Sequence, residues 1–128
     1  MRPKEMGDVA MANFERRLAV SLDGADILRV ALHGIEAEGR VDITVMRADD
    51  APNRVSWIVD WESKTISTSL ATATGPQLTC VAACLIGAAG ALADCLLRAK
   101  SKADVWECVE KNSVGAVFSG LGCVLACF

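Results

Sequence analysis

The sequence lacks several features that enzymes and nucleic-acid-binding proteins use. Tyrosine is absent, the single histidine is His33, and no cysteine precedes Cys80. There is no phosphate-binding glycine motif and no Gly-x-Ser-x-Gly. Residues 1–74 carry 9 Lys and Arg against 12 Asp and Glu, and the remainder carries 4 against 4, so no basic surface is expected. We therefore predict no catalytic residue, no cofactor and no nucleic-acid partner.

A secretory signal is also missing from the start of the chain. Met1–Val20 carries charges throughout and has no apolar central region. Yet six cysteines within about 50 residues are typical of proteins in an oxidising compartment such as the cell exterior. Two interpretations stay open: a precursor handled by a dedicated exporter or processing protease, and a cytosolic protein with reduced cysteines.

Residues 1–74 are predicted to form an α+β module that begins with short helices. Apolar residues recur every three or four positions over Met11–Leu22 and again over Ile27–Gly34. This spacing predicts two short helices interrupted at Asp23-Gly24. A strand over Leu18–Leu22 is the alternative.

The rest of this module has the spacing of strands. Apolar and polar residues alternate over Val41–Val45 and Val55–Trp61, and a third run follows over Lys64–Leu70. This pattern predicts a three-stranded antiparallel meander with one apolar face. We interpret Trp57 and Trp61 as packing residues of the core or sheet face rather than as a binding surface.

The small, polar and uncharged stretch Ser67–Gln77 predicts a linker, and it is where we expect a protease to cut. Division near this point gives a leader or accessory module, residues 1–74, and a cysteine-rich region, residues 75–128. In the second region the pattern predicts an all-α hairpin, with helices over Leu78–Ala99 and Lys102–Ala126. Ser101 with Asp104 resembles a capping box at the start of the second helix.

The cysteines determine how this hairpin is expected to close. They are Cys80, Cys84, Cys95, Cys108, Cys123 and Cys127. Steps of four, eleven and fifteen residues return to nearly the same helix face. In an antiparallel hairpin Cys80–Cys127 and Cys84–Cys123 share one register. Cys95–Cys108 departs from it by about one turn, or ~6 Å. We therefore predict a ladder of these three disulfides among the fifteen possible pairings, with a bend at the glycines of the second helix absorbing the offset.

A metal site and free buried thiols are the other interpretations of the cysteines. Zinc knuckles usually place Cys-x2-4-Cys on polar turns, whereas here Cys-x3-Cys lies in an apolar helix. The sole histidine, His33, is far away in the sequence and is interpreted as a surface or capping residue. We therefore predict no metal site.

Both predicted helices contain long runs without charge, Leu78–Ala93 and Asn112–Phe128. Each run is slightly shorter than the ~20 residues needed to span a bilayer. The surplus of apolar residues favours a second surface, either lipid or the N-terminal module. Against lipid, Trp106 and Phe128 are predicted to be interfacial membrane anchors. Trp106 at the hairpin tip could equally be a packing residue.

This organisation resembles the precursors of the halocin-type bacteriocins over Cys80 to Cys127. The shared features are a cysteine-free N-terminal region and a Gly- and Ala-rich, cysteine-laddered apolar helical region. The resemblance implies a secreted antimicrobial peptide released from a leader or immunity region, with a target membrane as its partner. The alternative is a non-enzymatic intracellular interaction domain with reduced cysteines, and a thiol-redox or metal protein is a minor third.

Overall fold

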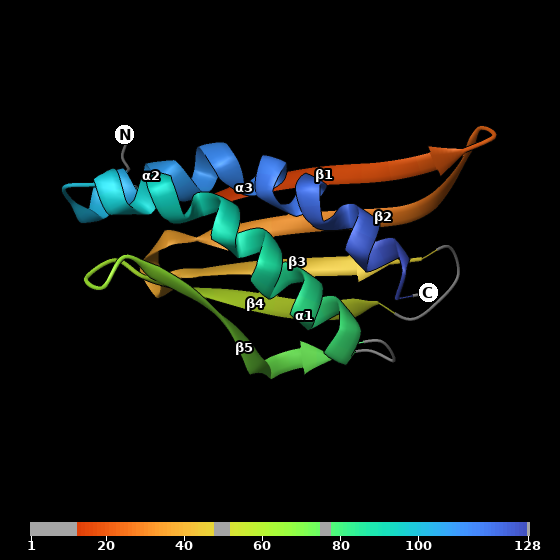
Figure 1. The fold of residues 1–128 in the computed structure, drawn as a ribbon, viewed down its shortest axis with the longest axis horizontal. Coiled ribbons are helices and arrows are strands. Elements are labelled where there is room, and N and C mark those ends of the chain that lie inside the picture. Colours follow the sequence, from red (N-terminus) through yellow and green to blue (C-terminus); the bar gives the residue numbers. More distant parts are fainter. Residues whose placement is uncertain (1–12, 48–51, 75–77, 128) are drawn as a thin grey trace, which may run out of the picture.

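Five strands form one antiparallel sheet in the order of the chain (Figure 1). The structure is a computed structural model that describes residues 13–47, 52–74 and 78–127. The strands are β1 (Asn13–Leu22), β2 (Ala25–Ile35), β3 (Arg40–Met46), β4 (Asn53–Asp60) and β5 (Thr65–Thr74). A meander of this kind needs only short connections between neighbouring strands.

The helical segments cover one face of this sheet (Figure 1). The covering segments are α1 (Leu78–Ala89), η3 (Gly90–Leu92), α2 (Ala93–Arg98) and α3 (Lys102–Leu125), while η2 (Glu36–Glu38) lies in the connection between β2 and β3. These four segments form a hairpin, in which α1 lies against β4 and β5 while α3 lies against β1 and β2. The predicted fold of a three-stranded meander followed by a separate all-α hairpin is therefore wrong.

The two predicted N-terminal helices are strands β1 and β2, and the reason lies at Asp23-Gly24. Both residues have positive φ, 53° and 82°, as a type I′ hairpin turn requires. The Asp-Gly pair is a hairpin signal that our interpretation took for a helix interruption. Steps of four residues also fit a strand, because they are multiples of its two-residue period. In β2 the buried residues alternate at Leu28, Val30 and Leu32.

The stretch predicted as a linker is largely strand. β5 extends to Thr74 and pairs with β4, for example through Ser67 opposite Ile58. Residues 67–74 are therefore part of the sheet, and the expectation of a linker there is wrong. Only residues 75–77 of the predicted stretch lie outside β5, and they are outside the described residues.

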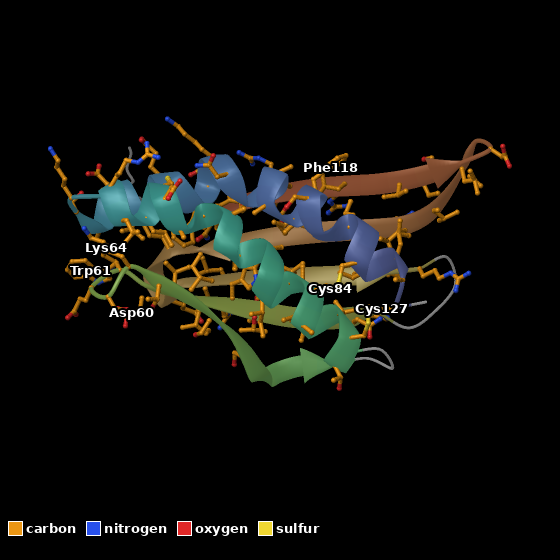
Figure 2. All side chains as sticks on the ribbon, viewed as in Figure 1. Asp60, Trp61, Lys64, Cys84, Phe118 and Cys127 are labelled. Carbon is orange, nitrogen blue, oxygen red and sulfur yellow. A yellow bond between two sulfur atoms is a disulfide. The ribbon has the colours of Figure 1, made fainter. Side chains whose placement is uncertain are left out.

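Sheet and helices share one hydrophobic core. At its centre Trp57 is fully buried, and its indole Nε1 donates a hydrogen bond to the backbone oxygen of Leu85 in α1, at 3.2 Å. This bond joins the two layers and confirms the core interpretation of Trp57. Trp61 differs: it is 42% exposed in the turn after β4 (Figure 2), so its interpretation as a packing residue is wrong.

A second contact joins the sheet to α3. Phe14 of β1 lies opposite Gly34 of β2, and its ring occupies the space that a side chain at Gly34 would fill. The same ring packs on Trp106 of α3, with centroids 5.7 Å apart. The missing side chain of Gly34 thus lets the aromatic pair close this side of the core.

Candidate functional site

Three disulfides join the two arms of the hairpin. They are Cys80–Cys127, Cys84–Cys123 and Cys95–Cys108, with Cα–Cα distances of 5.7, 5.7 and 5.9 Å. The prediction of disulfide bonding is confirmed, and these pairs are the ones that the helical register selects. Such bonds are compatible with an extracellular protein. No bridge reaches the sheet, since all six cysteines pair within the hairpin.

Two of the bridges are stacked at the open end of the hairpin. Cys84 Sγ lies 3.9 Å from Cys127 Sγ of the neighbouring bridge (Figure 2). The sulfurs of Cys80, Cys84 and Cys127 all lie within 4.8 Å of one another. Because each sulfur is already bonded to another, none is available as a thiolate ligand for a metal.

Close approach of the helices at this end depends on small residues. A side chain on Gly120 would begin 3.0 Å from Ala88 Cβ. The first arm contains the 3-10 turn Gly90–Leu92 between α1 and α2, whereas α3 is one continuous helix from Lys102 to Leu125. A bend at the glycines of the second helix stays a prediction.

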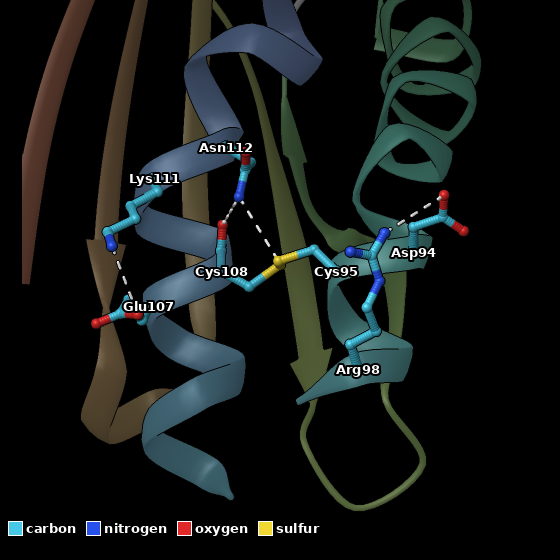
Figure 3. Close-up of a disulfide and its surroundings, with 7 residues drawn as sticks. All are labelled: Asp94, Cys95, Arg98, Glu107, Cys108, Lys111 and Asn112. Carbon is cyan, nitrogen blue, oxygen red and sulfur yellow. Dashed lines mark hydrogen bonds and ion pairs between the residues drawn. A yellow bond between two sulfur atoms is a disulfide. The ribbon is translucent and has the colours of Figure 1, made fainter. Parts of the chain in front are cut away.

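The third bridge lies in an open groove at the tip of the hairpin, and Figure 3 shows its surroundings. The groove has a volume of about 250 Å³. Its lining is Cys95, Arg98, Ala99, Asp104, Glu107, Cys108, Lys111 and Asn112. Asn112 Nδ2 donates to Cys95 Sγ at 3.6 Å and to the backbone oxygen of Cys108 at 2.9 Å. This bridge therefore has polar and charged neighbours, whereas the stacked pair lies among uncharged residues.

The start of α3 fixes the tip. Ser101 Oγ accepts a hydrogen bond from the Asp104 N–H at 3.2 Å, which is one of the two bonds of the predicted capping box. The Asp104 carboxylate accepts from the N–H of Lys100 at 3.1 Å, one residue before the cap. These two bonds satisfy backbone donors and hold the loop against the first turn of α3.

The solvent side of the hairpin carries no charge near the stacked bridges. We call its exposed residues the outer helical face: Thr79, Cys80, Ala83, Ile86, Gly87, Gly90, Ala91, Gly115, Phe118, Ser119, Gly122, Cys123 and Ala126. Ile86 is 55% exposed and Phe118 is 63% exposed. Large apolar side chains exposed on an uncharged surface favour contact with a partner or a membrane.

By length and composition, one helical segment within the described residues could cross a membrane, Thr79–Arg98. Buried residues make up 44% of its most apolar window. A core helix of a water-soluble protein meets the same criterion, so the segment alone does not identify a membrane protein.

The two predicted membrane anchors have different outcomes. Trp106 is only 5% exposed and packs on Phe14, so in this fold it is a core residue and its prediction as an anchor is not met. Phe128 lies outside the described residues.

His33 is exposed on the open face of the sheet, as predicted. Asn112 was missed, although its position one turn after Cys108 on the same helix places it beside the bridge.

Comparison of the chain with protein-family models, curated proteins and solved structures finds no match.

Proposed function

We propose that the chain is the precursor of a bacteriocin-like peptide, in which the disulfide-laddered hairpin acts on membranes and the sheet covers its inner face. One observation carries this proposal: around the stacked bridges the hairpin is uncharged on its solvent side and apolar on its inner side. On the inner side Val81, Leu85 and Leu121 are buried against the core. A helix that is apolar all round is stable in a protein interior or in a membrane.

The positions of the bridges support the same proposal. All three lie within the hairpin, so a cut between β5 and α1 would leave the hairpin fully cross-linked and free of covalent bonds to the sheet. Its partners would then be the target membrane and the protease or exporter that processes the precursor.

The charges divide the hairpin along its length. The uncharged parts end at Asp94 in one arm and Lys111 in the other, both close to the Cys95–Cys108 bridge. We infer that the uncharged half enters the lipid while the charged tip stays among the headgroups, because charges at the bilayer centre are costly.

The first test is the intact mass of the native product, measured without reduction and then after reduction and alkylation. A fragment that begins near Gly75 and gains six alkyl groups only after reduction is the expected result. A full-length chain that is alkylated without reduction would contradict the proposal.

Vesicle leakage tests membrane action directly. After proteolytic separation from the sheet, the product should release dye from neutral lipid vesicles, and Ile86→Lys should lower that release strongly by placing a charge on the outer helical face. The matched control is Leu97→Lys, which charges an exposed leucine at the tip of the hairpin, among residues that already carry charge. Equal leakage from both variants would remove the membrane role.

A second candidate is a non-enzymatic interaction domain, favoured by the core that sheet and helices share. In it the chain works uncut, and the outer helical face binds another protein. Persistence of the full-length chain with all three bridges intact in its native setting would favour this candidate.

A further inference from the structure

We propose that Cys95–Cys108 is a thiol–disulfide exchange site for a small, carboxylate-bearing thiol. It differs from the stacked bridges in lying in the tip groove of about 250 Å³, where solvent reaches it. Access is the first requirement for exchange, because a thiolate must approach one sulfur of the bridge. The groove is at the small end of ligand sites, so it suits a small thiol.

The two sulfurs of this bridge are not equivalent. Cys95 is half-buried, whereas Cys108 is 4% exposed. The side-chain amide of Asn112 donates to Cys95 Sγ at 3.6 Å. A donor at this position stabilises the Cys95 thiolate of the reduced chain, which is the nucleophile of the exchange. Cys95 is thus the exchanging sulfur, and Cys108 is the resolving one.

The charged residues of the groove indicate the class of thiol. Arg98 pairs with Asp94 at 4.0 Å, and Lys111 pairs with Glu107 at 3.5 Å. Both pairs are well exposed, and exposed ion pairs contribute little stability. Each cation can therefore exchange its partner for a carboxylate of the incoming thiol, as a small acidic peptide such as glutathione would provide.

The exchange takes place in two displacement steps, each of which breaks one S–S bond and forms another. In the reduced chain, the Cys95 thiolate attacks one sulfur of a small disulfide, whose S–S bond breaks, and one small thiolate leaves. The Cys108 thiolate then attacks Cys95 Sγ in the mixed disulfide, which forms the Cys95–Cys108 bond and releases the second small thiolate. Two electrons pass from the protein to the small disulfide, and the two protons from the cysteines end on the two released thiols. The reverse sequence reduces the bridge.

Glutathione redox buffers test the site in the full chain. After rapid alkylation and peptide mapping, we expect Cys95–Cys108 to open at a reductant level that leaves both stacked bridges closed. Cys108→Ala should accumulate a mixed disulfide with glutathione at Cys95, whereas Cys95→Ala should leave Cys108 largely as a free thiol. Equal uptake of glutathione by both variants, or earlier opening of the stacked bridges, would overturn the proposal.

Asn112 provides a separate test of the thiolate contact. Asn112→Leu should lower the equilibrium constant for reduction of the bridge about tenfold, which for a two-electron couple is a shift of about 30 mV to more negative potential. Asn112→Gln keeps the amide donor and should restore most of the difference. Identical potentials in the Leu variant and the native chain would show that the contact does not stabilise the Cys95 thiolate.

Discussion

The two ends of the hairpin are held together in different ways. At the open end, two stacked bridges lie among uncharged residues, and Gly120 brings α3 close to Ala88. At the tip, a single bridge lies in a charged groove beside Asn112, and Ser101 caps the helix. The open end is cross-linked twice over, while the tip depends on one accessible bond and on polar contacts. The open end therefore has most of the cross-links that stabilise the hairpin, and the tip has the accessible bridge that we propose as an exchange site.

The largest effect should come from removing both stacked bridges. Replacing all four of their cysteines by Ala opens loops of 47 and 39 residues, and the chain-entropy account gives about 4 kcal/mol of stability for each loop taken alone. Removing Cys95–Cys108 alone opens a loop of 13 residues, with a cost of about 3 kcal/mol. Denaturant unfolding measures both losses. A larger loss of stability on removing Cys95–Cys108 than on removing both stacked bridges would show that the tip, and not the open end, depends more on its cross-links.

Removing one half of a stacked bridge should make the open end rearrange. In Cys80→Ala the thiol of Cys127 is left near Cys84 Sγ, 3.9 Å away in the native chain, so a Cys84–Cys127 bond should form in part of the population and release Cys123. A loss of about 2 kcal/mol is expected.

The matched control is Cys95→Ala at the tip, where no second bridge is adjacent and Cys108 should stay unpaired. Peptide mapping under non-reducing conditions distinguishes the two variants. Finding Cys127 free in every molecule of Cys80→Ala would show that the stacked sulfurs do not exchange.

The close approach of the helices can be tested with a pair of glycines in α3. Gly120→Leu should destabilise the fold by about 1–3 kcal/mol, because overpacking forces the arms apart next to Ala88. Gly115 meets nothing within 4 Å, so Gly115→Leu should be neutral or stabilising through its better helix propensity. Thermal melts of both variants measure the difference, and equal melting temperatures would argue against tight packing at the open end.

The smallest effect concerns the sheet turn that follows β4. The N–H groups of Ser63 and then Glu62 donate to Asp60, which lowers the pKa of this carboxyl below its ordinary 3.8. Stability from this turn is therefore fully present above pH 3.8 and is lost as the pH falls through the lower pKa of the folded state. Melting temperatures measured over a series of acid pH values should therefore fall less steeply in Asp60→Asn than in the native chain. The same fall in both proteins would show that other carboxyls cause the loss of stability in acid.

The helical third of the fold could be predicted because its signals are local. The cap at Ser101 and the uncharged runs can be recognised from short stretches of sequence, and the spacing of the cysteines follows from the helix period. Strands β3 and β4 were also readable, because polar and apolar residues alternate there. In contrast, β1 and β2 were predicted as helices, since a spacing of four residues fits both periods and only Asp23-Gly24 distinguished them.

Other features needed the packed structure. The place of Trp106 in the core depends on Phe14 and Gly34, which are far away in the sequence and meet it only in the fold. The Ser- and Thr-rich β5 has the composition of a linker, and its pairing with β4 becomes visible only in the register of the sheet. Contacts between distant segments, rather than local preference, decide both cases.

The confinement of every bridge to the hairpin has a consequence for how the molecule could come apart. A single cut between β5 and α1 would convert one chain into a complex of two, held by packing and by contacts such as the Trp57–Leu85 hydrogen bond. From that moment the association would follow mass action: dilution would separate sheet and hairpin, and a lipid surface would compete with the sheet for the same apolar face. The sheet would then behave as a reversible inhibitor whose effect depends on concentration.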